Sequence, residues 1–157
     1  MKVLLAIDGS PCSLAAVKEV GSRHWPEGTV VRLLAAVTTR FPSFPDPLLI
    51  GAAVYHDLIE TERKRLDKLV ESTAAELRKS AAGKNLRIET TVVDGSPKEV
   101  IVEEAEKWGA DLILIGSHGY GNVKRFMLGS VSQAVATHAP CSVEIVRASQ
   151  RAQEQVD

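Results

Sequence analysis

Three glycines and a serine mark the segment of this chain with the clearest capacity for chemistry. In the stretch IGSHGYGNVKRFMLGSVSQAV, Gly116, Gly119 and Gly129 follow the spacing G-x2-G-x9-G, and Ser130 comes directly afterwards. The stretch holds four of the chain's eleven glycines. Because glycine in an ordered segment costs folding entropy, such a cluster indicates a tight turn, a close approach between elements or a ligand against bare backbone.

The spacing suits an anion site at the start of a helix. Gly116 ends an apolar run, Gly119 lets the backbone turn with its N–H groups exposed, and Gly129 precedes a helical pattern. The first N–H groups of a helix are unpaired, and its dipole favours negative charge. Ser130 can cap the helix, in a capping box with Gln133, and also donate its hydroxyl proton to a phosphate. Turn glycines before a capped helix remain the alternative.

Two common phosphate loops are excluded by the residues themselves. The chain contains no GK[ST], which a P-loop requires, and the dinucleotide fingerprint GxGxxG fails because Lys124 stands where its third glycine belongs. Lys124 and Arg125 are candidates to meet the outer phosphates, or else belong to a solvated loop. His118 could donate to a phosphate or act as an acid–base group, although no partner carboxylate is evident for the second role.

The elements that position these residues follow from five short apolar runs, separated by helical patterns. Strands are predicted at 2–7, 30–37, 86–93, 111–116 and 142–147. The runs at 2–7 and 111–116 are apolar on both faces, as in central strands of a parallel sheet, whereas the third and fifth resemble edge strands. Alternating strands and helices predict an α/β fold. Its doubly wound, five-stranded parallel sheet has the order 3-2-1-4-5 with helices on both faces, as in Rossmann-like proteins.

In a sheet of this order the ligand crevice lies at the carboxyl ends of strands 1 and 4. Asp8 follows the first of these strands and Gly116 ends the other. A carboxylate accepts hydrogen bonds and repels phosphate, so Asp8 suits ribose hydroxyls. A nucleotide with its ribose and base toward strand 1 and its phosphates toward the glycines accounts for both loops.

Helix starts are also marked in the sequence. The tetrapeptide DGSP occurs twice where a strand gives way to a helix, so Ser10 and Ser96 are predicted N-caps, each followed by proline at the first helical position. In the first helix, Leu14, Val17 and Gly21 are predicted to share the inward face. Residues 38–56 contain three prolines early on and are a candidate lid over the carboxyl edge of the sheet.

Over nearly its whole length the chain resembles the universal stress protein family. The resemblance is carried by VLLAIDGSPCSLAAV, VVDGSPKEVIVEEAEKWGADLILIGSHG and GNVKRFMLGSVSQAVATHAPCSVEIVR. It implies one nucleotide-binding domain over 1–148, and the residues that follow it, 149–157, are polar and are expected to fray. In this family the intact pattern G-x2-G-x9-G-[ST] separates members that bind ATP from those that do not, so the resemblance implies an adenine-nucleotide site, with ATP, alone or with Mg²⁺, as its ligand.

The resemblance also implies roles for individual residues. Ala6, Ile7 and Asp8 would lie along adenine and ribose, with Val37 and Ile115 beside the base. Gly116, Gly119, Gly129, Ser130 and Val131 would hold the phosphates, and His118 lies within the same pattern. A homodimer through the strand at 142–147 is implied too. Glu144 departs from the usual apolar character there, and an antiparallel pairing could set it opposite the partner's Arg147.

Composition and charge limit the remaining classes of function. Nineteen basic residues against 20 acidic ones give a net charge of −1, so no global field attracts nucleic acid or an anionic membrane. No apolar run reaches the length of a membrane span or a signal-peptide core. Cys12 and Cys141 lie far apart without a CxxC partner, which favours a reducing cytoplasm.

The predicted function is that of an ATP-binding regulatory protein of the stress response, with slow hydrolysis or none. An ATPase needs a group that positions water and usually a Mg²⁺ ligand, and Asp8, the strongest carboxylate candidate in the crevice, already has the ribose role. Two alternatives stay open: a dimeric interaction module without nucleotide in the cell, and a weak ATPase.

Overall fold

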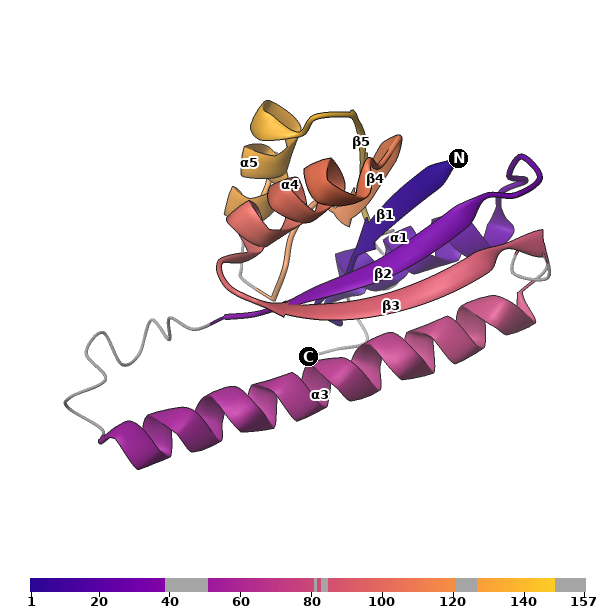
Figure 1. The fold of residues 1–157 in the computed structure, drawn as a ribbon. Helices are drawn as coiled ribbons and strands as arrows, with labels where there is room; N and C mark the ends of the chain where they lie inside the picture. Colours follow the sequence, from indigo (N-terminus) through magenta and orange to yellow (C-terminus); the bar gives the residue numbers. More distant parts are fainter. Residues whose placement is uncertain (39–50, 81, 83–84, 121–126, 149–157) are drawn as a thin grey trace.

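The computed structural model describes residues 1–38, 51–80, 82, 85–120 and 127–148 (Figure 1). Its elements are β1 (Lys2–Ala6), α1 (Pro11–Ser22), β2 (Val30–Val37), α3 (Ala52–Lys79), β3 (Arg87–Asp94), α4 (Pro97–Trp108), β4 (Leu112–Gly116), α5 (Ser130–His138) and β5 (Ser142–Val146). Each strand matches its predicted range to within one residue at either end. Most of the predicted lid (39–50), Lys124 and Arg125, and the tail at 149–157 lie outside the described residues.

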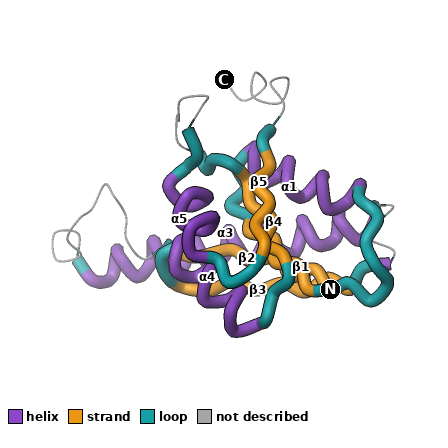
Figure 2. Tube along the Cα trace, turned by 90° about the horizontal axis from the view of Figure 1, so that it is seen from above, coloured by secondary structure: helices purple, strands orange, loops and turns teal. Residues whose placement is uncertain are grey.

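All strand pairs are parallel, and the five-stranded sheet has the order β3-β2-β1-β4-β5 (Figure 2). This confirms the predicted fold class and the predicted strand order. The strand β1 pairs with β2 on one side and β4 on the other, so the winding of the chain reverses between β1 and β4. β3 and β5 form the two edges, as their mixed polarity predicted.

Helices cover both faces of the sheet, with α3 on one side and α4 and α5 on the other (Figure 1). Successive residues of β1 point to opposite faces, as the pleat requires. Val3 and Leu5 pack in the core cluster that includes α1 and α3, whereas Leu4 joins the cluster with α4 and α5. All three side chains are fully buried, which explains why this run is apolar at every position.

The inward face of α1 differs from the prediction. Leu14 is 41% exposed, whereas Cys12, Ser13, Ala16 and Val20 are buried. The helix turns its small residues inward because β4 approaches its first turn very closely, which leaves no room there for a leucine. Val17 is only partly buried, while Gly21 does pack inward, since a Cβ on it would meet Leu77 of α3 and the C-cap Ser80 at 3.3 Å.

The predicted start of α1 is confirmed in detail. Ser10 is the N-cap, its hydroxyl accepts a hydrogen bond from the Ser13 amide at 3.3 Å, and Pro11 is the first helical residue. Ser96 and Pro97 occupy the corresponding places before α4, but the Ser96 side chain makes no capping hydrogen bond. Both helices begin at the carboxyl edge of the sheet, which places their first turns beside the switch point.

Candidate functional site

A cavity of about 290 Å³ opens at the carboxyl ends of β1 and β4, where the order of the strands reverses. This is the position at which open α/β sheets bind their ligands, and the volume is close to the lower end of the range for small-molecule sites. Ten residues predicted from the sequence line it: Ala6, Ile7, Asp8, Ile115, Gly116, His118, Gly119, Gly129, Ser130 and Val131. The structure thus brings together residues from both ends of the chain.

Val37 is the predicted site residue that does not line the cavity. It is fully buried in the core cluster on the α1 and α3 side of the sheet. Its neighbour Ala36 lines the cavity instead, because successive residues of a strand point to opposite faces. The carbonyl of Val37 is also occupied, since it accepts a hydrogen bond from the Gly95 amide at 2.9 Å.

An apolar wall on the α4 side of the cavity was missed at the sequence level. It consists of Leu34 and Ala36 from β2 with Pro97 and Ile101 from α4. Two signals could have found it: alternate residues of a strand share a face, and residues four apart on a helix do too. Ser10, Ser13 and Ser132 also line the cavity and were not predicted to do so. The cavity therefore has an apolar side and a side rich in hydroxyls and backbone.

Gly116 serves the packing of α1 against β4. A Cβ at this position would lie 2.6 Å from the carbonyl carbon of Cys12 and 2.7 Å from the Ser13 nitrogen. Those are backbone atoms of α1, so no side-chain movement can relieve the contact. Only glycine lets the helix approach the strand end this closely, and this fixes one wall of the cavity.

Asp8, in the loop between β1 and α1, lies close to Gly119 in the loop that follows β4. Its Oδ1 accepts a hydrogen bond from the Ser10 amide at 2.8 Å, and its Oδ2 lies so near Gly119 that a Cβ there would be 2.9 Å away. The Ser10 hydroxyl also donates to the carbonyl of His118 at 3.2 Å. The half-buried carboxylate is thereby oriented along the cavity wall, with its second oxygen able to accept from a ligand.

The beginning of α5 presents unpaired donors to the cavity. The first helical hydrogen bond runs from the Gln133 amide to the Gly129 carbonyl at 2.9 Å. Within the described residues, the amides of Ser130, Val131 and Ser132 have no acceptor. All three residues line the cavity. Such a helix end favours an anion through both its free N–H groups and its dipole.

The predicted Ser130–Gln133 capping box is wrong. The N-cap of α5 is Gly129, whose amide donates to the Ser117 carbonyl at 2.8 Å, and this long-range bond sets the helix start one residue earlier than predicted. Ser130 is consequently the first helical residue. In the described part of the chain its hydroxyl has no hydrogen-bond partner, so it is available to a ligand.

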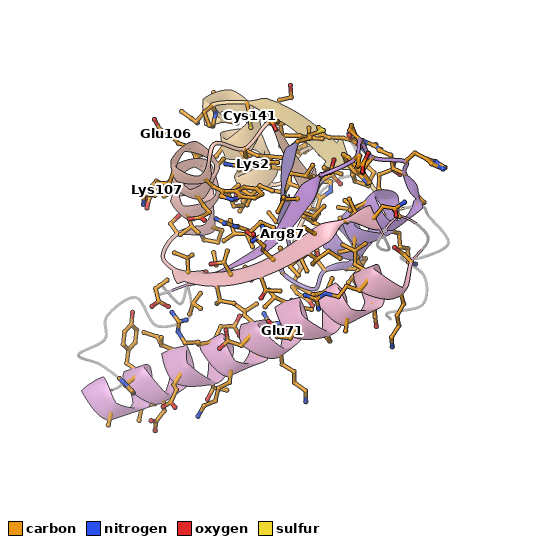
Figure 3. The ribbon with its side chains drawn as sticks, turned by 45° about the vertical axis from the view of Figure 1, so that its right-hand side comes forward. Lys2, Glu71, Arg87, Glu106, Lys107 and Cys141 are labelled. Carbon is orange, nitrogen blue, oxygen red and sulfur yellow. The ribbon has the colours of Figure 1, made fainter. Side chains whose placement is uncertain are left out.

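Arg65, on α3, carries a positive charge that interacts with the carboxylate of Asp8. The guanidinium of Arg65 donates two hydrogen bonds to Glu62, at 2.8 and 2.7 Å. These bonds raise the pKa of Arg65, with a smaller contribution from the negative charge of Asp8. The long helix α3, which lies along one side of the molecule in Figure 3, therefore contributes charge near the cavity as well as core packing.

A separate polar cluster lies near the start of α3. His56, Asp57 and Glu60 are exposed, and their potential ligand atoms lie within 4.8 Å of one another. Lys64 already pairs with Glu60 at 2.7 Å, and this contact lowers the pKa of Glu60. None of the three residues lines the cavity, so the cluster does not belong to the candidate site.

The fold and the site together define a doubly wound α/β protein with a ligand cavity at its switch point. The family model of the universal stress protein family matches residues 1–147, and the chain belongs to that family. A putative universal stress protein of Staphylococcus epidermidis is 34% identical over 149 residues, which cover 92% of this chain and 82% of the relative. No helix in the described part of the chain is long and apolar enough to cross a membrane.

Two solved structures resemble the whole chain. One, of the hypothetical protein MJ0577, has a TM-score of 0.80 and 26% identity, covering 95% of this chain and 96% of that one. The other is a universal stress protein in complex with cAMP, with a TM-score of 0.66 and 26% identity over 95% and 98% of the two chains.

Proposed function

We propose that this cavity binds an adenine nucleotide, with ATP, accompanied by Mg²⁺, as the physiological ligand. The observation that carries the proposal is the start of α5, where three free amides and the Ser130 hydroxyl meet a cavity that is apolar on its other side. Free donors at a helix start suit phosphates, and the wall formed by β2 and α4 suits a flat base. Asp8 lies where it can accept from ribose hydroxyls.

The comparisons support this proposal at the level of ligand class. The solved relative in complex with cAMP holds a molecule composed of adenine, ribose and one phosphate. Each of these parts has a chemically matching wall in the present cavity. The choice of ATP rests on the intact glycine pattern and on the number of free donors near Gly129.

We further propose a regulatory role with slow hydrolysis or none. Among the described residues that line the cavity, Asp8 is the only carboxylate, and its assignment to the ribose leaves no second one to position water. Nucleotide occupancy would then act by changing the surface that the segment 117–128 presents to a protein partner. A weak ATPase is the competing function, and release of inorganic phosphate by the purified protein distinguishes the two.

We also propose a cytoplasmic homodimer that pairs through β5. The strand is an edge of the sheet in the described structure, so one row of its backbone groups can pair with a second copy. Glu144 already has an ion pair within the chain, with Arg23, so apolar contacts would carry such an interface. Sedimentation analysis tests the dimer. Crosslinking of cysteines substituted at 144 and 147 of different subunits tests the antiparallel register.

The decisive experiment for nucleotide binding replaces Ser130 by glutamate and by glutamine, because these two side chains have nearly the same shape and differ in charge. Ser130→Glu places a negative charge at the helix start, which favours the helix but repels phosphate. Ser130→Gln is the neutral matched control. Calorimetric titration of nucleotide-stripped protein with ATP and Mg²⁺ should show binding to the wild type, weaker binding to the Gln variant and the weakest to the Glu variant.

Thermal unfolding without ligand should show that the Glu variant is at least as stable as the Gln variant, since the helix dipole favours the acid. Equal ATP affinity in the two variants would contradict the proposal that the phosphates bind at the start of α5. Absence of binding to the wild type would favour the alternative of an interaction module that works without nucleotide.

A further inference from the structure

We propose that His118 is a positioning residue that closes the loop between β4 and α5, holding the anion site ready for its ligand without contacting phosphate itself. The proposal rests on the proposed function, because it concerns how the same nucleotide site is organised. It gives His118 a different role from the phosphate contact or acid–base function expected from the sequence.

Both ring nitrogens of His118 are engaged by the protein. Nδ1 lies 3.0 Å from the Ser117 hydroxyl, and Nε2 is hydrogen-bonded to the carbonyl of Met127. A carbonyl can only accept, so Nε2 carries the proton, and in the neutral ring Nδ1 then accepts from Ser117. The hydrogen-bond partners thereby select one tautomer, and its only N–H is used within the protein.

The residues around His118 form the point where several elements meet. The Ser117 amide donates to the Val146 carbonyl at 2.7 Å, which ties this position to β5. The Ser117 carbonyl accepts from the Gly129 amide at 2.8 Å and from the Ser132 hydroxyl at 2.9 Å. The carbonyl of His118 accepts from Ser10. The backbone at 117–118 is therefore held by contacts that do not involve the imidazole.

From this fixed point the imidazole reaches Met127, two residues before the N-cap Gly129. It thus connects the two described ends of the segment 117–128. The ring in this way sets the position of the chain at Met127, just before the start of α5. Preorganisation of this kind raises affinity because less ordering is left to the ligand.

Three substitutions separate this role from direct contact. In His118→Gln the side-chain amide nitrogen takes the place of Nε2 and can still donate to Met127. In His118→Asn the corresponding nitrogen takes the place of Nδ1, so the Met127 contact is lost, as it is in His118→Ala. Calorimetry on the full chain should show ATP affinity within about threefold of wild type for Gln and about tenfold weaker for Asn and Ala, which is roughly one hydrogen bond.

Adenosine should bind all four proteins equally, because it lacks the phosphates that the loop receives. A similar loss of ATP affinity in the Gln and Ala variants would overturn the proposal, and so would wild-type affinity in the Asn variant. Thermal unfolding shows whether each variant is folded. The proposal can also be tested on the wild type alone, by a measurement that needs no substitution.

That measurement is nitrogen NMR of the His118 ring in the full chain. Without nucleotide it should show the Nε2-protonated tautomer, and ATP should leave the Nε2–H bond to Met127 in place. A ring protonated on Nδ1, or transfer of the Nε2 hydrogen bond to phosphate, would contradict the proposal. If the wild type bound no ATP, the proposed function would fail, while the tautomer of the free protein would still decide whether His118 closes the loop.

Discussion

Gly116 and Cys12 lie in backbone contact, so close that a Cβ on Gly116 would be 2.6 Å from the carbonyl carbon of Cys12. By contrast, a Cβ on Gly119 would meet the Asp8 Oδ2 at 2.9 Å, which is the end of a side chain. Two glycines of one pattern thus serve different purposes. The first is required for α1 to pack on β4, and the second lets the Asp8 carboxylate approach the glycine loop.

This difference predicts that alanine at Gly116 mainly lowers stability, whereas alanine at Gly119 mainly weakens binding. Gly116→Ala should lower the free energy of unfolding by about 3 kcal/mol, near the upper end for overpacking, because backbone atoms must move. Gly119→Ala should cost less than about 1 kcal/mol, since the carboxylate can rotate away, but it should weaken ATP binding by displacing Asp8. Urea unfolding followed by circular dichroism measures the first effect and calorimetry the second. Equal losses of stability would contradict the distinction.

Asp8 should contribute to binding through the ribose hydroxyls. Asp8→Asn keeps the oxygen that accepts from the Ser10 amide but removes the charge, so ATP affinity should fall about tenfold or more, as for a charged hydrogen bond. The same substitution should have little effect on 2′,3′-dideoxy-ATP, which lacks both hydroxyls. Asp67→Asn, an equal charge change at an exposed position of α3, is the matched control. Equal losses for both nucleotides would exclude a ribose contact.

The strand order could be predicted because each apolar run is long enough to show one or two buried faces. The side of the sheet on which a single residue lies was harder to predict. Val37 and Ala36 are both small and apolar, and only the phase of β2 decides that Ala36 reaches the cavity. Leu14 was misplaced because the inward face of α1 is set by the close approach of Gly116, a contact between distant parts of the chain.

Long-range contacts also explain the other differences at the site. Gly129 and Ser130 are both acceptable N-caps by type, and the bond from the Gly129 amide to the Ser117 carbonyl decides between them. The glycine spacing indicated correctly which residues of this segment come together, since Gly116, Gly119 and Gly129 line the cavity, and that they bind an anion stays a prediction. It gave no information about the two contacts of the His118 ring, which depend on the path of the loop.

Cys141 should react slowly with alkylating agents near neutral pH. Burial raises the pKa of its thiol, and the negative charge of Asp111 raises it further, so less thiolate is present at a given pH. Iodoacetamide labelling followed by peptide mass spectrometry should give a pH midpoint for Cys141 above that of the same cysteine in urea. Cys141→Ser confirms the assignment of the peptide. An unchanged or lower midpoint in the folded protein would contradict the prediction.

The same shift fixes the sign of a small dependence of stability on pH. At a pH above 9.0, the ordinary pKa of a cysteine thiol, Cys141 loses its thiol proton in the unfolded chain but retains it in the folded chain. The unfolded state then binds fewer protons, so the free energy of unfolding falls as pH rises through this window. Comparing wild type with Cys141→Ser from pH 8 upward isolates the effect, because the serine variant lacks this ionisation. A difference that stayed constant with pH would argue against it.

The ion pair between Arg23 and Glu144 should anchor the edge strand β5 to the end of α1. The guanidinium donates to both carboxylate oxygens, at 2.8 and 2.6 Å, and a further bond joins Arg23 to Glu19 at 2.8 Å. The pKa of Arg23 is raised chiefly by Glu144 and then by Glu19. Both side chains of the pair are 33% exposed, so solvent screens the interaction and a coupling of about 0.5–1 kcal/mol is expected.

A double-mutant cycle with Arg23→Gln and Glu144→Gln measures this coupling by urea unfolding. Glu19→Gln is the matched control, since it removes a partner of Arg23 on α1 itself without touching β5, and it should have the smaller effect. Because the contact joins residues 121 positions apart, its loss should also speed hydrogen exchange in β5. A coupling near zero, with unchanged exchange in β5, would mean that apolar packing alone holds this strand and that Glu144 is free to serve an interface.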